Sequence, residues 1–251
     1  MRSVDVLGVR IDDLTYGEAL ARLRHALTAR TPLVVTTPNP EIVMLARADR
    51  EFADVLNRAG LNIPDGIGLI LAARLRGERL REHVQGTDLV QMLAADSAAA
   101  GDRWFLLGGQ GDVARRAGLA LQRQAPGLQI AGAAPGSPRV EDDPSTRALI
   151  AAAGRVDVLL VAYGAPRQER WLDRNLAVLG IPVGIGVGGV FNYLAGDAPR
   201  APRWLRRGHL EWLHRLITQP WRWRRQLALP RFALLAAGQA LAGASVRRRR
   251  S

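Results

Sequence analysis

Five short segments hold the residue types that could do chemistry, because each places glycine or polar side chains directly after an apolar run. They are VVTTPN at 34–39, NIPDGIG at 62–68, LLGGQG at 106–111, VAYGAPRQE at 161–169 and GVGGVFN at 186–192. Ligands of open α/β sheets bind at the carboxyl ends of the strands, where such turns lie. We therefore expect the five segments to line one cleft.

The carboxylate of the second segment, Asp65, is a candidate general base. A carboxylate held in a cleft can take the proton from an attacking hydroxyl group, and the glycines that follow it would let a substrate approach closely. The motif alone favours a plainer interpretation, in which Asp65 caps a helix or closes an Asx-turn before Gly66. Both interpretations stay open at the level of the motif.

The other polar residues of these segments also have two interpretations each. Thr37 and Asn39 are first the turn and cap of a helix that begins at Pro40, and only second donors to a ligand. Gln168 and Glu169 open an arginine-rich helix, where they could bind polar groups of a ligand or complement the helix dipole.

The third segment fits part of a dinucleotide-binding fingerprint, since Gly109, Gly111 and Ala114 match G-x-G-x-x-A. That fingerprint also needs an acidic residue at the end of the next strand, and the expected strand at 128–131 ends in Gly132. A nicotinamide dehydrogenase is therefore not expected. The backbone N–H groups of the turn could still hold a diphosphate, or the glycines could simply permit a tight turn.

The elements that must position these turns alternate along the first two hundred residues, which predicts a Rossmann-like α/β fold with a mostly parallel sheet flanked by helices. Apolar runs predict strands at 33–36, 103–107, 128–131, 157–161 and 182–187, with a hairpin near 4–12. Helical periodicity predicts helices at 17–29, 40–58, 87–100, 111–124, 143–153 and 166–178. We expect Thr87 to cap one of these helices and Gly101 to end it.

Charge divides the chain in two. The 251 residues carry a net charge of +12, and every basic residue is Arg. Residues 1–199 contain twenty-two Arg and twenty-two acidic residues, whereas residues 200–251 contain thirteen Arg and a single acidic residue, Glu211. The whole excess therefore lies after residue 199. We expect an α/β catalytic domain at 1–199 and an Arg/Trp-rich helical appendage at 200–251.

The sequence offers little to a metal ion or a disulfide. It has no cysteine, its four histidines are scattered, and neither H-E-x-x-H nor D-x-D occurs. The N-terminal residues lack the apolar stretch of a secretory signal, so we expect a cytoplasmic protein. The apolar segment 232–246 is shorter than the ~20 residues of a membrane span, so it should lie on a membrane or pack as a terminal helix.

The five turns and several further blocks, taken in order, resemble the WecG/TagA/CpsF glycosyltransferases, known as glycosyltransferase family 26. The resemblance covers roughly residues 5–230 and rests on VTTPN followed by EIVMLA, NIPDGIGL, HVQGTDL, FLLGGQGDVA, VAYGAPRQERW, GVGGVFNYLAG, RAPRWLRRGHLEWLHRL and QPWRWRR. Chance does not produce so many blocks at family-like spacing.

The resemblance implies an inverting, metal-independent glycosyltransferase of cell-surface polysaccharide synthesis. It would move a hexose-type sugar, such as N-acetylmannosamine, its uronic acid or glucose, from a UDP-sugar to a polyprenyl-diphosphate-linked saccharide. The reaction would take place at the inner face of the cell membrane. No cofactor is implied, because the UDP-sugar is a co-substrate.

The resemblance also assigns residues, with Asp65 as the base that deprotonates the acceptor hydroxyl. The residues expected at the substrates are Thr37, Asn39, His83, Gln168 and Glu169. A separate possibility, which the resemblance does not assign, is that Arg215, Arg222 and Arg225 of the appendage fold back over the cleft and bind the departing diphosphate. The residues expected near the nucleotide are Gly108, Gly109, Gly164, Gly188, Gly189 and Asn192.

Two positions depart from the pattern of the family. His83 follows Glu82 where the family usually has Arg, so a fixed positive charge that could help the diphosphate depart is replaced by a titratable one. Arg79, Arg81 or an arginine of the appendage would have to substitute. Asn192 stands where the family often has Asp, which puts a donor contact there in doubt.

The basic appendage has two candidate partners. Arg and Trp, as in PWRWRRQ at 220–226, are typical of an anionic membrane interface, where each basic residue contributes ~1 kcal/mol. Nucleic acid is the alternative partner, but no nucleic-acid-binding motif accompanies the patch. We therefore expect a peripheral membrane protein that binds no nucleic acid, with Trp204 or Trp212 packed on the body. The sequence leaves the oligomeric state open, a homo-oligomer included.

Overall fold

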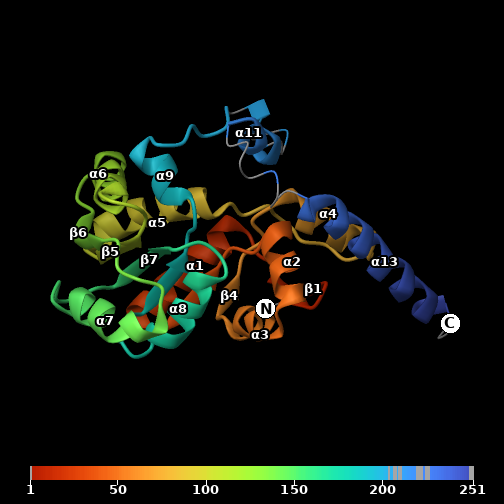
Figure 1. Ribbon diagram of the computed structural model, residues 1–251, viewed down its shortest axis with the longest axis horizontal. Coiled ribbons are helices and arrows are strands. Elements are labelled where there is room, and N and C mark those ends of the chain that lie inside the picture. The colour runs from red at the N-terminus through yellow and green to blue at the C-terminus, as the bar shows by residue number, and fades with distance from the viewer. Residues whose placement is uncertain are drawn as a thin grey trace.

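The protein is described by a computed structural model that covers residues 2–202, 204, 205, 208, 211–218, 223 and 227–248, with the backbone alone at 211, 215 and 243–248. Within these ranges the chain forms an α/β core, and the C-terminal helix projects from one side of it (Figure 1).

Six strands form one sheet in which all neighbouring strands run parallel, in the order β4-β3-β8-β7-β5-β6. Their bounds are β3 (Leu33–Thr36), β4 (Leu61–Asn62), β5 (Arg103–Gly108), β6 (Gln129–Ala134), β7 (Val158–Ala162) and β8 (Val183–Gly186). The connections that follow β3 and β7 lead toward the β4 edge of the sheet, whereas the connection that follows β5 leads toward the β6 edge. The direction therefore reverses between β7 and β5, and open α/β sheets form their ligand crevice at such a point. The predicted parallel sheet is confirmed.

Helices cover both faces of this sheet, as the fold class predicts (Figure 1). Their bounds are α1 (Tyr16–Ala29), α2 (Pro40–Ala48), α3 (Arg50–Arg58), α4 (Ile67–Leu75), α5 (Gly86–Ala100), α6 (Val113–Gln124), α7 (Asp143–Ala151), α8 (Arg167–Asn175), α9 (Val190–Ala195), α11 (Glu211–Thr218) and α13 (Ala228–Arg248), with a 3-10 turn η1 at Val140–Asp142.

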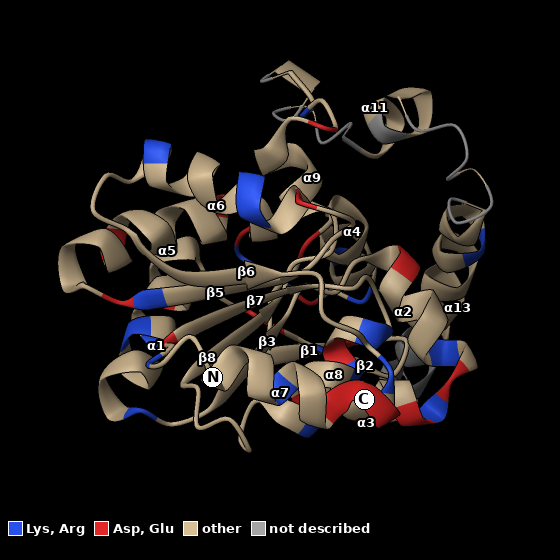
Figure 2. Ribbon diagram, turned by 60° about the vertical axis from the view of Figure 1, so that its left-hand side comes forward, with Lys and Arg blue, Asp and Glu red and all other residues tan. Residues whose placement is uncertain are grey.

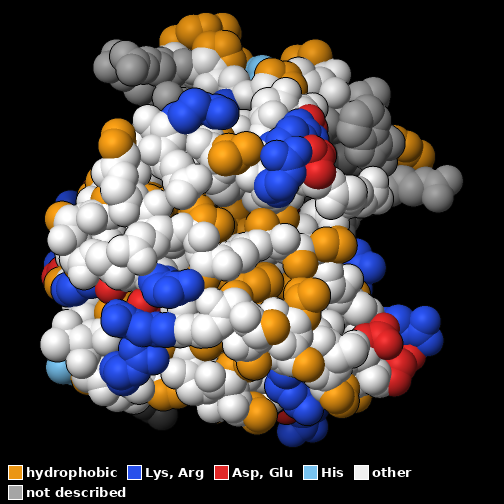
Figure 3. Space-filling view, turned by 90° about the vertical axis from the view of Figure 1, so that its left-hand side faces the viewer, with side chains coloured by type: hydrophobic (Ala, Val, Ile, Leu, Met, Phe, Trp, Pro, Cys, Tyr) orange, Lys and Arg blue, Asp and Glu red, His pale blue; other side chains and the backbone are white. Residues whose placement is uncertain are grey.

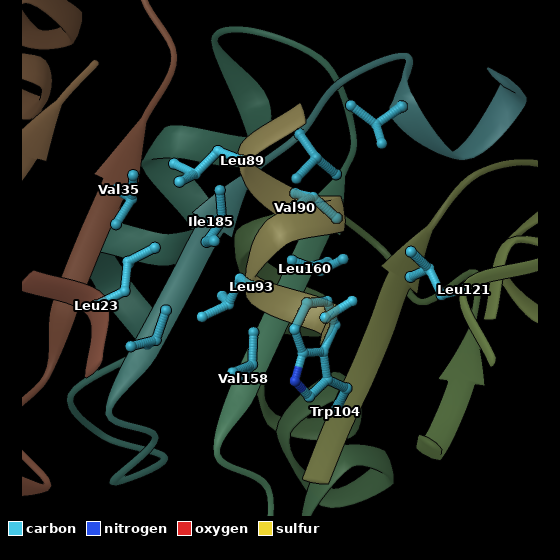
Figure 4. Close-up of a cluster of buried hydrophobic side chains, with 14 of the residues drawn as sticks. Leu23, Val35, Leu89, Val90, Leu93, Trp104, Leu121, Val158, Leu160 and Ile185 are labelled. Atoms are coloured by element: carbon cyan, nitrogen blue, oxygen red, sulfur yellow. The ribbon is translucent and has the colours of Figure 1, made fainter. Parts of the chain in front are cut away.

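Alternation along β5 shows how the sheet divides the core. Trp104 packs in a buried cluster with Leu93 of α5 (Figure 4), whereas its neighbour Phe105 packs in another cluster with Trp171 of α8. Successive side chains of a strand point to opposite faces of the sheet. Both faces are therefore buried, which is why these strands read as continuous apolar runs in the sequence.

The predicted helix at 40–58 is wrong in one respect, because it is two helices. Asp49 leaves the helical backbone, and its side chain caps α3 by accepting a hydrogen bond from the N–H of Phe52 at 3.0 Å. The apolar periodicity continues across this break, so periodicity alone joins α2 to α3.

Two further helix starts differ from the prediction. The sequence pattern predicts no helix at 67–75, where α4 lies, because the preceding glycine-rich segment is typical of a turn. Thr87 is not a cap, since α5 begins at Gly86 and Thr87 lies in its first turn. Gly101 ends α5 in the left-handed conformation, as predicted.

The predicted hairpin is confirmed as β1 (Ser3–Val6) and β2 (Val9–Asp12), which pair antiparallel. It packs with α2, α3 and α4 in a third buried cluster, and Phe232 and Ala236 of α13 belong to the same cluster. Of the two expectations for the segment 232–246, packing as a terminal helix is therefore correct for its first part. Among the helices of the described ranges, none is both long enough and apolar enough to cross a bilayer.

Other features of the appendage differ from expectation or stay open. Trp204 is 69% exposed and Trp212 is 43% exposed, so neither is buried against the body, although Trp212 lines the same cavity as residues of the body. The domain boundary after residue 199 stays a prediction, although α13 packs on the body as the preceding cluster shows. Arginine and acidic residues lie interspersed along the body (Figure 2), and both kinds of side chain appear on the face that Figure 3 shows, in keeping with the neutral sum of the body.

Candidate active site

The carboxyl ends of the six strands meet at one cavity of about 1890 Å3. All five segments singled out in the sequence contribute to its wall, as expected. Of the predicted site residues, those that line the cavity are Thr37, Asn39, Asp65, His83, Gly109, Gly164, Gln168, Gly188, Gly189 and Asn192. A parallel sheet produces this convergence because all its strands end at the same edge.

Asp65 lies directly after β4, beside Thr37. Its N–H donates to the carbonyl of Pro38 at 3.0 Å, which ties the turn after β4 to the turn after β3. A Cβ atom added to Gly86 would lie 3.0 Å from Thr37 Cγ2 and 3.8 Å from Asp65 Oδ2, so the start of α5 closes over both side chains. The helix-cap interpretation of Asp65 does not hold for α4, whose N-cap is Gly66 and has no side-chain hydrogen bond.

Thr37 and Asn39 both form hydrogen bonds that stabilise the fold, and both line the cavity. Thr37 Oγ1 donates to the carbonyl of Gly186 at 3.2 Å, which joins the ends of β3 and β8. Asn39 caps α2, because its side chain accepts a hydrogen bond from the N–H of Ile42 at 3.0 Å. The cap interpretation of Asn39 is therefore confirmed, whereas the observed bond of Thr37 joins two strand ends and does not test its interpretation as a turn residue. The roles of both residues at a ligand stay predictions.

Gln168 ties two glycine turns together. Its Oε1 accepts hydrogen bonds from the N–H groups of Gly164 at 3.1 Å and Gly188 at 2.9 Å. Its Nε2 donates to Oε1 of Glu169 at 2.8 Å. Because both groups that face Oε1 are donors, this orientation of the amide is the one that satisfies them. Gln168 thus holds the turn after β7 against the turn after β8.

Glu169 lies behind Gln168 and is not in the cavity wall. Its side chain is completely buried, and Oε2 has no hydrogen-bond partner among the described residues. Burial raises the pKa of Glu169 to about 7. The one side chain it hydrogen-bonds is Gln168, within the described part of the chain. Any influence of Glu169 on a ligand therefore passes through the amide of Gln168.

The predicted glycines serve two different purposes. Gly108 ends β5 at φ +108°, and a Cβ there would lie 2.9 Å from the carbonyl carbon of Ala162, so Gly108 lets β5 and β7 approach each other. Gly164 also has a positive φ, +74°, but a Cβ there would meet open space. Gly164 therefore leaves a part of the cavity wall to bare backbone, whereas Gly108 is absent from the wall.

Two of the arginines considered as substitutes at the position next to Glu82, Arg79 and Arg81, do not reach the cavity. Arg81 forms ion pairs with Glu18 at 2.6 Å and Asp13 at 3.3 Å, and neither Arg81 nor Arg79 lines the cavity. His83 does line it. The residue next to Glu82 therefore lies at the site, but as His83 it does not carry a fixed positive charge.

Two other arginines line the cavity that the sequence did not single out as site residues. Arg167 begins α8, is exposed, and has no ion pair or hydrogen bond within the described ranges. Arg200 forms an ion pair with Asp88 at 2.6 Å and thereby connects the segment after α9 to α5. No motif marks Arg200, because its partner lies 112 residues away in the chain.

Two tyrosines near the site are not among the predicted site residues, although Tyr163 lies in the segment 161–169 that is expected to line the cleft. The N–H of Gln85 donates to the Tyr16 hydroxyl at 2.7 Å, and burial raises the pKa of Tyr16, with the charges of Asp88 and Asp65 adding to the effect. Tyr163 lines the cavity, and its buried hydroxyl has no hydrogen-bond partner among the described residues. Both are single aromatic residues without a local pattern.

The predicted roles of several residues are not tested by the described part of the structure. Arg222 and Arg225 lie outside the described residues, and so does the side chain of Arg215. Their predicted place at a departing diphosphate therefore stays a prediction. Asn192 lies on α9, is exposed and lines the cavity. Within the described ranges, no three His, Asp or Glu side chains come together as a metal site would require.

Known proteins match this chain over nearly its whole length. The profile of the Glycosyl transferase WecG/TagA/CpsF family matches residues 4–246. The N-acetylglucosaminyldiphosphoundecaprenol N-acetyl-beta-D-mannosaminyltransferase of Bacillus subtilis (strain 168) is 36% identical over 214 residues, which is 84% of this chain and 81% of that protein.

Two further relatives carry the same name. The one from Bacillus spizizenii (strain ATCC 23059 / NRRL B-14472 / W23) is 34% identical, over 79% of this chain and 76% of its own. The one from Staphylococcus aureus (strain NCTC 8325 / PS 47) is 28% identical, over 85% and 84%. With the parallel sheet and the cavity at its carboxyl edge, these matches show that the chain belongs to the WecG/TagA/CpsF family of glycosyltransferases.

Proposed function

We propose that this glycosyltransferase moves N-acetylmannosamine from UDP-N-acetylmannosamine to N-acetylglucosamine carried on a polyprenyl diphosphate, with inversion and without a metal ion. The printed names of the relatives support this donor sugar and this acceptor, since relatives at 36% and 34% identity share one name. The observation that carries the chemistry is the place of Asp65, which lies in the cavity wall beside Thr37.

Asp65 would act as the general base of a single displacement. It takes the proton from the acceptor hydroxyl, whose oxygen attacks the anomeric carbon of the donor sugar. The bond from that carbon to the diphosphate oxygen breaks at the same time, and UDP leaves with the electron pair. An attack from the face opposite the leaving group inverts the anomeric centre. The turns would contribute chiefly by holding both substrates in line.

In the proposed reaction no metal ion neutralises the negative charge of the departing diphosphate, so positively charged or N–H groups of the protein must do so. The turn after β5, at Gly109 and Gln110, and the guanidinium of Arg167 line the cavity, and we propose that the backbone N–H groups of that turn and this guanidinium neutralise this charge. Arg215, Arg222 and Arg225 are the further cations that we propose for this role. His83 adds a positive charge only when it is protonated, so the fixed charge must come from arginine.

Substitution of Asp65 tests the catalytic part of this proposal. We expect Asp65→Asn to lower the rate of UDP release and of disaccharide-lipid formation by a factor of about 10² to 10⁴, because general-base assistance contributes that much. The Kd for UDP should stay unchanged, since the carboxylate acts on the acceptor. Product analysis with several UDP-sugars, each offered with the same lipid-linked N-acetylglucosamine, identifies the donor.

Asp173→Asn is the matched control for this experiment. Asp173 forms an ion pair with Arg58 at 2.6 Å and is not in the cavity wall. It should keep full activity, because an exposed ion pair contributes little. Full activity of Asp65→Asn, or equal losses in the two variants, would refute the role of Asp65.

We further propose that the basic appendage holds the enzyme loosely at an anionic membrane surface on the cytoplasmic side, where its lipid-linked acceptor lies. Trp204, Trp212 and Trp223 are exposed, and thirteen arginines follow residue 199. Exposed tryptophans and clustered cations are typical of such an interface. Nucleic acid remains the second candidate partner, on the charge alone.

Charge removal is the right test of the appendage, because deleting residues 200–251 would also remove Phe232 from the core. We expect Gln at positions 222, 224, 225 and 247–250 to abolish sedimentation with phosphatidylglycerol vesicles at low salt, while the midpoint of unfolding is unchanged. Undiminished sedimentation would contradict the membrane assignment. If the unmodified protein binds duplex DNA as tightly as it binds the vesicles, and the same substitutions remove that binding, nucleic acid would be favoured as the partner.

A further inference from the structure

The cavity is larger than one small ligand requires. Its volume of about 1890 Å3 exceeds the roughly 300–1,000 Å3 of an ordinary ligand pocket. The polar turns that carry Asp65 and Gln168 form one part of the wall, and α2, α4 and α13 form another. The part of the wall that these three helices form differs in chemistry from the polar turns, and we call it the helical part of the wall.

The helix α4 contributes an apolar stripe to the helical part of the wall. Ile67, Leu71 and Leu75 line the cavity and are spaced by four residues, which places them on one face of the helix. The side chains of Leu71 and Leu75 are 49% and 59% exposed. Large apolar side chains that cluster at the surface next to a binding site mark a place where another apolar surface binds.

The opposing walls are apolar as well. From α13, Leu229 and Ala233 line the cavity, and from α2, Ile42 and Leu45 do so. Leu45 is 39% exposed. We call the surface formed by Ile42, Leu45, Ile67, Leu71, Leu75, Leu229 and Ala233 the apolar trough.

The apolar trough begins next to the catalytic carboxylate. The three helices meet at Gly68, where an added Cβ would lie 2.6 Å from Pro40 Cγ and 3.6 Å from Phe232 Cε1. Gly68 follows Asp65 by three residues, and both lie in the wall of the same cavity. A molecule that reacts at Asp65 can therefore extend directly into the trough.

Charge restricts what this extension can be. Among the described residues that α2, α4 and α13 place in the cavity wall, Glu41 is the one with a charged side chain. A nucleotide, a sugar diphosphate or a nucleic acid would find no cation there. A hydrocarbon chain needs none, because the removal of apolar area from water drives its binding.

We propose that the apolar trough binds the isoprene units that follow the diphosphate of the acceptor lipid, so that the enzyme recognises part of the lipid chain itself. This inference rests on the proposed function, because it assumes a polyprenyl diphosphate as the acceptor carrier. The saccharide then reaches Asp65 while the first part of the chain lies along α4, and the remainder of the chain can stay in the bilayer.

Binding of short isoprenoid diphosphates tests the trough without any sugar transfer. Titration calorimetry on the full chain would compare farnesyl diphosphate, which has three isoprene units, with dimethylallyl diphosphate, which has one. We expect the longer ligand to bind at least about tenfold more tightly, since each added unit buries more apolar area. Leu71→Gln combined with Leu75→Gln should remove most of this difference and leave the weak binding of the short ligand unchanged.

Leu149→Gln is the matched control, because Leu149 is 45% exposed on α7 and does not line the cavity. It should bind both ligands as the unmodified protein does. The midpoint of denaturant unfolding shows whether each variant folds. Equal binding of the two ligands by the unmodified protein would overturn the proposal, and so would equal losses for both ligands in the double variant.

Two other results distinguish this inference from the proposed membrane surface and from the proposed donor and acceptor sugars. If the double variant binds farnesyl diphosphate normally but no longer sediments with phosphatidylglycerol vesicles, the exposed leucines contact the membrane surface and the trough proposal is wrong. If the chain-length preference is present but no UDP-sugar is transferred to lipid-linked N-acetylglucosamine, the trough stands and the proposed donor or acceptor sugar is wrong.

Discussion

The amide of Gln168 connects two turns of the candidate site to the buried carboxyl group of Glu169. Oε1 of Gln168 accepts hydrogen bonds from the N–H groups of two turns, and its Nε2 donates a hydrogen bond to Glu169. Gly186 leaves room for this amide, since a Cβ there would lie 3.0 Å from Nε2. The spacing of the turns around the cavity thus depends on a buried, ionisable neighbour.

The buried carboxyl group predicts a pH-dependent stability that a neutral substitute removes. Burial raises the pKa of Glu169 from the ordinary 4.5 to about 7, so between these values the folded state binds the proton more strongly than the unfolded chain does. Its contribution to the free energy of unfolding is therefore greatest below the lower value and is lost as the pH rises through about 7. Urea unfolding should show that Glu169→Gln is more stable than the unmodified protein at about pH 8.5, by roughly 1 to 3 kcal/mol.

The same comparison at low pH is the control. At about pH 4 the unmodified protein carries a neutral Glu169, so the two proteins should differ by less than about 1 kcal/mol. A constant difference across the pH range would show that the carboxyl group does not titrate in this window. Lower stability of Glu169→Gln at high pH would mean that a charge at this position stabilises the fold.

At the scale of the elements, the site depends on how closely neighbouring strands approach. Gly108 permits the contact of β5 with the backbone of β7, and its φ of +108° is one that other residues rarely adopt. Gly164 and Gly188 serve a different purpose, because their N–H groups face Gln168. The glycines that look alike in the sequence therefore divide into those that position strands and those that position turns.

This division predicts a large effect of one alanine substitution. Gly108→Ala should lower the free energy of unfolding by more than about 2 kcal/mol, because its Cβ would approach three backbone atoms of Ala162 as closely as 2.9 Å. Gly154→Ala is the matched control, since Gly154 also has a positive φ, +74°, but a Cβ there meets nothing within 4 Å. It should cost only about 1 kcal/mol. Equal costs in urea unfolding would show that the close approach does not matter.

At the scale of the whole molecule, the C-terminal region is divided between core and surface. The first part of α13 completes the cluster that holds the hairpin, while Leu234 and Leu241 on the same helix are 76% and 74% exposed. The body contributes no net charge, and residues 200–251 contribute all of it. The same segment therefore contributes to the folded core and also carries the positive charge that an anionic partner would bind.

The packing of α13 predicts that a residue near the C-terminus stabilises the whole fold. Phe232 is 4% exposed, so Phe232→Ala should lower the free energy of unfolding by about 3 kcal/mol or more. Leu234→Ala, two positions along the helix and 76% exposed, should change it by less than about 0.5 kcal/mol. Small effects of both would mean that α13 does not belong to the cooperative core.

Much of the fold could be predicted because its signals are local. The apolar runs at 33–36 and 103–107 are buried on both faces, so they read as strands without reference to their partners. The start of α4 could not be predicted, because the same glycines that suit a turn also suit the close packing at Gly68. The break at Asp49 is a capping event inside a continuous apolar pattern, which periodicity does not resolve.

The sequence by itself determined the parallel α/β class, the turns that end the strands, the candidate carboxylate Asp65 and the place of the excess charge. Each of these follows from residue type and spacing within a few residues. The tertiary structure alone decided that Arg200 lines the cavity, that Gln168 holds two turns, and that α4 and α13 share an apolar wall. These contacts join residues far apart in the chain, and only the packed sheet brings them together.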